Sequence, residues 1–360
     1  MKTCVHHDSR GMALIMAMIA IFVLSALAAG FALSMKVETR LAQNADSEQQ
    51  LLWLGRSGVE LARYVLSQQL TIPSEPYDAL NQIWAGGSGG IDASNSALSG
   101  LSLDHYPVGD GGTVSVKIID LERKANINTA NDAAIQQALT LMGVDANDIS
   151  VVSDSILDWI DPDDLPKVAG AESDYYQGLA VPYYAKNAPI DDLAELLLVK
   201  GVTQEMYWGS NSTNHIPSVF QHKLGFGTAP GQAPDYPFGL VNLFTPISGG
   251  RININTADVN VLQMLPGVDA ATAAAIIQQR AGPDGVEGTD DDVPFRNASQ
   301  LSSTGLSPQF VSQLANLCTV RSLAFEVHVT AQIGDYQREY VAILYRNSGT
   351  DIQVVSFYWK

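Results

Sequence analysis

The densest group of carboxylates in this sequence lies in the stretch GPDGVEGTDDD, residues 282–292. Five carboxylates fall within nine residues without an intervening lysine or arginine: Asp284, Glu287, Asp290, Asp291 and Asp292. Their mutual repulsion favours a bound cation, and calcium suits the loop because it accepts carboxylates and backbone carbonyls in irregular geometry. The spacing does not fit the EF-hand pattern D-x-[DN]-x-[DN]-G. We therefore expect a calcium site here, with a solvated acidic turn as the alternative.

A second acidic group lies in the stretch SDSILDWIDPDD, residues 153–164. Asp154, Asp158 and Asp161 are spaced by four and then three residues, which places them on one face of a helix. The candidate ligands of a second calcium ion are Asp158, Asp161, Asp163, Asp164 and Glu172. Helix capping and ordinary surface charge account for the same residues and are the favoured interpretation.

No arrangement of residues in the sequence indicates catalysis. Beyond the first eleven residues the histidines are His105, His215, His222 and His328, which are scattered and form no H-E-x-x-H motif. Residues 86–90 read GGSGG and formally match G-x-S-x-G, but they lack the preceding strand and following helix of a nucleophile elbow. No glycine-rich phosphate loop carries a lysine. We therefore expect a protein that is not an enzyme.

The N-terminus combines a charged leader with a long apolar segment. Residues 12–35 contain no charge and would form a helix of about 36 Å, enough to cross a bilayer core of roughly 30 Å. No A-x-A-like cleavage pattern of a secretory signal follows the segment, so we expect the helix to be retained. Lys2 and Arg10 precede it, and the chain beyond is acidic, which predicts a cytoplasmic N-terminus with the bulk on the other side.

The composition fits an exported protein. The formal net charge is −18, and removal of residues 1–11 leaves 18 basic and 37 acidic residues. Such a surface repels nucleic acid and anionic lipid. Cys4 would leave with the leader, so Cys318 would be the sole remaining cysteine and no intramolecular disulfide is expected.

The periodicity of apolar residues predicts the helices and strands that must position the two acidic groups. Helical spacing of apolar residues continues beyond the apolar segment towards Gln69, which predicts one long stalk helix. Four stretches alternate as strands, namely 113–120, 323–333, 336–346 and 352–359. Because these strands together would cover the stalk, we expect one sheet, with the roughly 200 residues between Asp120 and Leu323 as an insertion.

The insertion is helical and internally repeated. The segment NINTA occurs at 126–130 and 253–257, and each copy leads to Gly-Val-Asp-Ala, at 143–146 and 267–270. Two weaker turns occur at 201–203 and 305–307. We expect Gly143, Gly201, Gly267 and Gly305 to end helices in the left-handed conformation, with the Asp, Thr or Ser two residues later capping the next helix. We also expect Thr129 and Thr256 to be N-caps, and the paired asparagines to bond to backbone.

The second repeat, residues 252–279, is similar to helix-hairpin-helix units that bind DNA. Such units bind phosphate through the N–H groups of the glycine turn, aided by lysine or arginine. Here Asp258 and Asp269 flank the turn at Gly267, and the first basic residue is Arg280. The charge favours a role in protein packing and argues against nucleic acid as a partner.

The leader resembles the class III signals of the type IV pilin and type II secretion pseudopilin families. Arg10 and Gly11 stand directly before the apolar helix that begins at Met12. The resemblance implies cleavage between Gly11 and Met12 by a prepilin peptidase, and N-methylation of Met12. Most pilins carry glutamate at the fifth mature position, whereas this chain has Met16. Absence of that membrane-buried carboxylate fits a minor subunit at a filament tip.

Within the insertion, LDWIDPDD, GAE, YY, PY and LAELLLVKGVTQEMY follow in the order found in the minor pseudopilin K family of type II secretion. The resemblance covers about residues 10–65 and 120–310. It implies an α+β fold in which a long N-terminal transmembrane and stalk helix packs on a small antiparallel sheet, with a large inserted all-α domain of helix-hairpin-helix-like (SAM-like) repeats. The expected segments are a leader (1–11), a transmembrane helix (12–35), a stalk (36–70), a pseudopilin core (71–122 and 323–360) and an inserted domain (123–322).

The function implied by this resemblance is that of a minor pseudopilin that caps and initiates the periplasmic pseudopilus, and so supports export of folded proteins across the outer membrane. The implied partners are the minor pseudopilins I, J and H, the prepilin peptidase and the inner-membrane secretion platform. The implied location is the bacterial inner membrane, with one span. Calcium loops in pseudopilins add support for the loop at 282–292. The alternatives are a minor pilin of a type IV pilus and a membrane-anchored helix-hairpin-helix DNA-binding protein.

Overall fold

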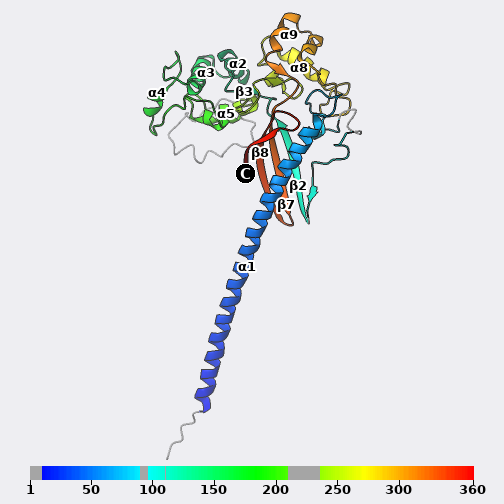
Figure 1. Cartoon of the computed structure of the whole chain (residues 1–360). Helices are drawn as coiled ribbons and strands as arrows, with labels where there is room; N and C mark the ends of the chain where they lie inside the picture. Colours follow the sequence, from blue (N-terminus) through cyan, green and yellow to red (C-terminus); the bar gives the residue numbers. More distant parts are fainter. Residues whose placement is uncertain (1–9, 90–95, 110, 210–235) are drawn as a thin grey trace, which may run out of the picture.

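A long helix, a five-stranded sheet and a helical domain make up the computed structural model of the chain (Figure 1), which describes residues 10–89, 96–109, 111–209 and 236–360. Helix α1 (Arg10–Gln69) has 60 residues, which corresponds to about 90 Å. Its side chains are exposed from Met12 to Asp46, and it enters the core at Leu51. The predicted continuous stalk is confirmed. By length and hydropathy (2.6 over its most apolar window), its N-terminal part could span a membrane.

The sheet is antiparallel throughout, in the order β1-β2-β7-β8-β9. Its strands are β1 (Tyr106–Val108), β2 (Gly112–Asp120), β7 (Ala324–Ile333), β8 (Tyr336–Arg346) and β9 (Ile352–Trp359). Four of them match the predicted strands. The short β1 was not predicted, because three residues are too few to show alternation.

Helix α1 lies against one face of this sheet at very short range. An added Cβ at Gly55 would lie 2.5 Å from the Tyr340 ring, and one at Gly58 would lie 2.3 Å from Val329. Alternate residues of β2, such as Val114, point into the resulting core. The two glycines therefore allow the helix backbone to approach the strands more closely than any side chain would permit.

The segment between β2 and β7 forms the helical domain, whose two repeats share one hydrophobic core. Its helices are α2 (Asp132–Met142), α3 (Ala146–Ile160), α4 (Ser173–Gln177), η3 (Leu193–Leu198), α5 (Gln204–Trp208), α6 (Leu240–Leu243), α7 (Val259–Leu262), α8 (Ala270–Arg280), η5 (Ala298–Thr304) and α9 (Pro308–Leu314). A further short helix, η1 (Ile83–Ala85), packs beside α1. Two small parallel pairs complete the domain: β3 (Ala125–Asn126) with β4 (Phe244–Thr245), and β5 (Ile252–Asn253) with β6 (Cys318–Thr319).

The second asparagine of each NINTA segment makes the same pair of hydrogen bonds from its side-chain amide to backbone. Asn128 exchanges two hydrogen bonds with the backbone of Ile190 (2.7 and 2.9 Å), and Asn255 does the same with Phe295 (2.8 and 2.9 Å). The asparagines two residues earlier accept hydrogen bonds from the N–H groups of Asn128 and Asn255. The predicted bonds from these side chains to backbone are confirmed.

The four glycine turns all have positive φ, between +76° and +92°. The residue two positions later caps the next helix in each case, since Asp145, Thr203, Asp269 and Ser307 accept hydrogen bonds from the first turns of α3, α5, α8 and α9. The prediction that Thr129 and Thr256 are N-caps is wrong. The helices begin two residues later, at the caps Asn131 and Asp258.

A buried polar network connects the helical domain to the sheet, and we call it the junction network. Its centre is Asp120 at the end of β2, whose carboxylate accepts hydrogen bonds from the Glu122 N–H (2.8 Å) and from three side chains. These are Asn253 (3.0 Å), Thr256 (2.6 Å) and Ser322 (2.7 Å). Arg346 forms an ion pair with Asp78 beside it, and both side chains are buried. The second repeat is thus tied directly to the sheet.

Candidate metal centre

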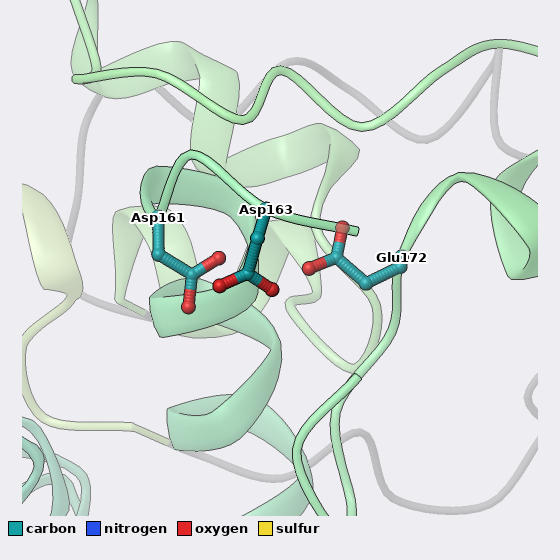
Figure 2. Close-up of side chains that lie close together, drawn as sticks. All are labelled: Asp161, Asp163 and Glu172. Carbon is teal, nitrogen blue, oxygen red and sulfur yellow. The ribbon is translucent and has the colours of Figure 1, made fainter. Parts of the chain in front are cut away.

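Three of the predicted carboxylates converge at the end of α3. Asp161 is the C-cap of α3, Asp163 lies two residues further on, and Glu172 occupies the N-cap position of α4. One ligand oxygen from each lies within 4.8 Å of the others, and their carboxylates face one another (Figure 2). We call these three residues the acidic cluster. Among the described residues, no other group of three or more potential metal ligands converges in this way.

Glu172 has the unusual environment in this cluster. The residue is only 3% exposed, and neither carboxylate oxygen has a hydrogen-bond partner. It stands at an N-cap position but makes no capping hydrogen bond. Burial, together with Asp158 and Asp161, raises the pKa of Glu172 to about 7. A buried carboxylate without donors is costly, and a cation in the cluster would remove that cost.

The other two candidate ligands serve the loop that follows α3. Asp158 is fully buried and accepts hydrogen bonds from the backbone N–H of Lys167 (3.1 Å) and from its ammonium group (3.1 Å). Gly170 must be glycine, because an added Cβ would lie 1.9 Å from the Asp158 carboxylate. Asp164 accepts a hydrogen bond from the Ser173 N–H (3.3 Å). The sequence spacing did not distinguish these structural carboxylates from the converging three.

The acidic loop at 282–292 is organised differently. Glu287 forms an ion pair with Arg280 of α8, a buried residue whose guanidinium also donates to the carbonyls of Ile254 (2.6 Å) and Ala257 (2.7 Å). Asp291 accepts hydrogen bonds from the Asp284 N–H (3.0 Å) and the Thr289 hydroxyl (2.7 Å). Asp292 accepts one from the Gly288 N–H (2.8 Å). Sequence reasoning missed Arg280, which reaches the loop from the preceding helix.

The remaining candidate positions are distributed over the chain. Gly11 and Met12 both lie within α1. His215 and His222 lie outside the described residues. His328 sits between Glu326 (2.6 Å) and Glu339 (2.9 Å) on neighbouring strands, and these hydrogen bonds raise its pKa. This histidine therefore has a structural explanation as a link between β7 and β8.

Comparison with known proteins gives two family matches, which lie mostly in the insertion. Residues 115–209 match the family described as type II secretion system protein K, and residues 248–319 match the helix-hairpin-helix motif. The acidic cluster lies inside the first match. The second contains the repeat that supplies Asn253 and Thr256 to the junction network.

Relatives extend the match along the chain. The type II secretion system protein K of Pseudomonas aeruginosa is 24% identical over 361 positions, covering 96% of this chain and 91% of the relative. The protein of the same name from Pectobacterium carotovorum is 25% identical over 271 positions, covering 69% of this chain and 70% of the relative.

The fold also matches a solved structure. A chain in the GspK-GspI-GspJ complex of the type 2 secretion system of enterotoxigenic Escherichia coli aligns with a TM-score of 0.61 and 19% identity, covering 89% of this chain and 99% of that chain. The resemblance carried by the leader and the LDWIDPDD segment is confirmed. This chain is therefore similar to the type II secretion system protein K family over residues 115–209, and to one relative of that name over nearly its whole length.

Proposed function

We propose that this chain is a structural subunit that caps the tip of the periplasmic pseudopilus and initiates its assembly, in support of protein export across the outer membrane. The observation that carries the proposal is the position of the inserted domain. It sits beyond the sheet, at the end of the molecule opposite the apolar end of α1 (Figure 1). If subunits associate through parallel stalks, the inserted domain would block the position above this subunit. Met16, in place of the usual glutamate, adds support, because a subunit above would have no carboxylate to pair with.

The partners we propose are the minor pseudopilins I and J, with H as a further candidate. The solved complex that this chain resembles contains GspK, GspI and GspJ by its title. Exposed apolar residues on the free part of α1, such as Val37 and Leu41, offer a surface for neighbouring stalks. We expect the full chain, solubilised in detergent, to co-purify with I and J.

A pair of matched substitutions tests this arrangement. Leu41→Lys on the stalk should reduce capture of I and J, whereas Val168→Lys, on a fully exposed residue of the inserted domain, should leave it unchanged. A chain that stays alone in every mixture would contradict the proposed tip complex. Equal capture by both variants would move the interface away from Leu41.

We further propose that a prepilin peptidase cleaves the leader between Gly11 and Met12, and that Met12 is then methylated. The mature chain would be anchored in the inner membrane by one span, with its N-terminus in the cytoplasm and residues beyond about 36 in the periplasm. Intact-mass measurement of protein extracted from membranes should give a chain that begins at methylated Met12. Recovery of a chain that still begins at Met1 would refute this processing.

We also propose that the acidic cluster binds calcium through Asp161, Asp163 and Glu172. The support is the Glu172 carboxylate, which is buried and has no donor. An ion there would neutralise like charges and join the end of α3 to the start of α4, so its role would be structural. Calcium suits the cluster better than magnesium, because magnesium demands near-octahedral geometry. The loop at 282–292 remains a second, independent prediction.

Thermal unfolding of the full chain in detergent separates the two candidate sites. An ion that binds only the folded state adds RT ln(1 + [L]/Kd) to stability, so millimolar calcium should raise the unfolding temperature relative to chelator. Glu172→Gln should abolish the shift if the acidic cluster is the site. The double substitution Asp290→Ala with Asp292→Ala should abolish it only if the 282–292 loop is the site. An unchanged curve with the unmodified chain would exclude both.

A further inference from the structure

One lysine lies in direct contact with the acidic cluster. The ammonium of Lys167 is 2.6 Å from Asp161 Oδ2 and 3.1 Å from Asp158 Oδ1. Among the described residues, no other lysine or arginine forms an ion pair with Asp161, Asp163 or Glu172. Lys200 lies nearby but donates to the backbone carbonyls of Ala169 and Gly170 instead.

The two oxygens of Asp161 are in different situations. Oδ2 accepts the ammonium of Lys167, whereas Oδ1 is buried and has no partner. The cluster therefore offers three unpartnered buried oxygens, one from Asp161 and two from Glu172. A fourth oxygen, on Asp161, is held by a positive charge.

We propose that Lys167 is a built-in counter-cation that sets the calcium affinity of the acidic cluster. In the calcium-free protein its ammonium offsets part of the repulsion between Asp158 and Asp161 and holds the loop after α3 in place. In the calcium-bound protein the same charge repels the ion and occupies Asp161 Oδ2. Lys167 thus stabilises the empty site and weakens the filled one.

This inference rests on the proposed calcium binding, and it makes a two-sided prediction. Lys167→Met should bind calcium more tightly, on the order of tenfold, because a positive charge near a divalent ion has been removed. The same variant should unfold at a lower temperature than the unmodified chain when chelator is present. A residue with a purely structural role would lower the unfolding temperature without improving affinity.

The experiment is a calcium chloride titration by calorimetry on the full chain in detergent, after removal of calcium with chelator. Lys167→Arg keeps the charge and should keep the affinity close to that of the unmodified chain. Lys167→Gln provides a polar replacement in case the methionine variant does not fold. Lys186→Met is a matched control, because Lys186 also bridges two carboxylates in the same repeat, Asp191 (2.6 Å) and Glu195 (2.8 Å). It should leave the affinity nearly unchanged.

The outcomes distinguish calcium binding by the acidic cluster from the effect of Lys167 on its affinity. Tighter binding by Lys167→Met and Lys167→Gln, but not by Lys186→Met, supports the inference. Unchanged or weaker binding by these variants, while Glu172→Gln abolishes binding, overturns the role of Lys167 and leaves the calcium site intact. Absence of calcium binding in the unmodified chain and in the Lys167 variants refutes the site, and the inference with it.

Discussion

Two buried carboxylates in this molecule have opposite surroundings. Asp120, in the junction network, accepts four hydrogen bonds, one from backbone and three from side chains. Glu172, in the acidic cluster, accepts none. Burial is the largest cause that raises the pKa of each. Burial alone therefore does not distinguish a carboxylate that supports the fold from one available to a ligand.

The difference lies in the supply of donors. Around Asp120 the donors come from the second repeat and from the chain just before β7, so the carboxylate joins segments far apart in sequence. Around Glu172 the neighbours are other carboxylates, and the nearby ammonium of Lys167 goes to Asp158 and Asp161. A buried carboxylate whose oxygens all accept hydrogen bonds stabilises the fold, whereas one whose oxygens accept none is available to bind a cation.

The largest expected effect is at Asp120. Asp120→Ala should lower the free energy of unfolding by about 3–5 kcal/mol, because it removes the acceptor that the buried side chains of Asn253, Thr256 and Ser322 share. Asp120→Asn keeps one acceptor and should lose less. Calorimetric unfolding of the full chain in detergent measures both. A loss below about 1 kcal/mol for Asp120→Ala would show that the junction network contributes little.

The opposite sign is expected at Glu172 when calcium is absent. Glu172→Gln removes a buried charge that has no donor, so in chelator near pH 8 it should stabilise the protein by up to about 3 kcal/mol, which is the rise in the pKa of Glu172 from 4.5 to about 7 at about 1.4 kcal/mol per unit. Comparison with Asp120→Asn under the same conditions sharpens the contrast, since that amide substitution should destabilise. If both amide variants shift the unfolding temperature in the same direction, the distinction between the two carboxylates fails.

The junction also predicts a pH dependence. Burial and the neighbouring Asp120 raise the pKa of Glu122 to about 8, from an ordinary value of 4.5. The folded state therefore holds this proton more tightly than the unfolded state, so its contribution is complete below pH 4.5 and is lost as pH rises through about 8. Between pH 5.5 and 8.5 the unmodified chain should lose about 1–2 kcal/mol more stability than Glu122→Gln. His328 titrates in both proteins, so its contribution cancels in this difference. Parallel pH profiles would contradict the prediction.

The smallest effects are expected at the glycine turns, which differ between the repeats. Gly143→Ala should cost about 1 kcal/mol, because φ is +84° but no atom lies within 4 Å of the added Cβ. Gly267→Ala should cost somewhat more, since its Cβ would lie 2.8 Å from the Phe310 ring. Thermal unfolding of the two variants side by side measures the difference. A larger loss for Gly143→Ala would be inconsistent with the packing of the second repeat.

The sequence predicted those parts of the fold that depend on the spacing of nearby residues. Alternation located the strands from Thr113, Tyr336 and Ile352, and helical spacing located the stalk. The repeated NINTA segments predicted two related units, although the predicted caps Thr129 and Thr256 are not the caps in the structure. Local spacing cannot show that the chain runs on to Asn131 and Asp258 before each helix begins.

The candidate site was predicted less completely, because its geometry is tertiary. The sequence named Asp161, Asp163 and Glu172, but it could not separate them from Asp158 and Asp164, which the fold uses as hydrogen-bond acceptors. Nor could it show that Arg280 pairs with Glu287 in the other acidic loop. Which carboxylates are bare depends on where backbone N–H groups and distant side chains arrive in the folded chain.

The pairing of β2 with β7 has a consequence for how the chain folds. Asp120 lies opposite Phe325 in the sheet, so two neighbouring strands are separated by the entire inserted domain. Long-range pairing of this kind is slow, because the ends of a long segment must meet before any contact rewards the lost chain entropy. If the inserted domain folds first, its compact form brings the two ends close together and shortens that search. Strand β7 can pair with β2 only after the roughly 200 intervening residues have been made, which takes roughly 10–40 s at the usual rate of synthesis of about 5–20 residues per second. Until then the edge of β2 that pairs with β7 has no partner strand. The inserted domain must therefore be completed before the core between α1 and the sheet can form.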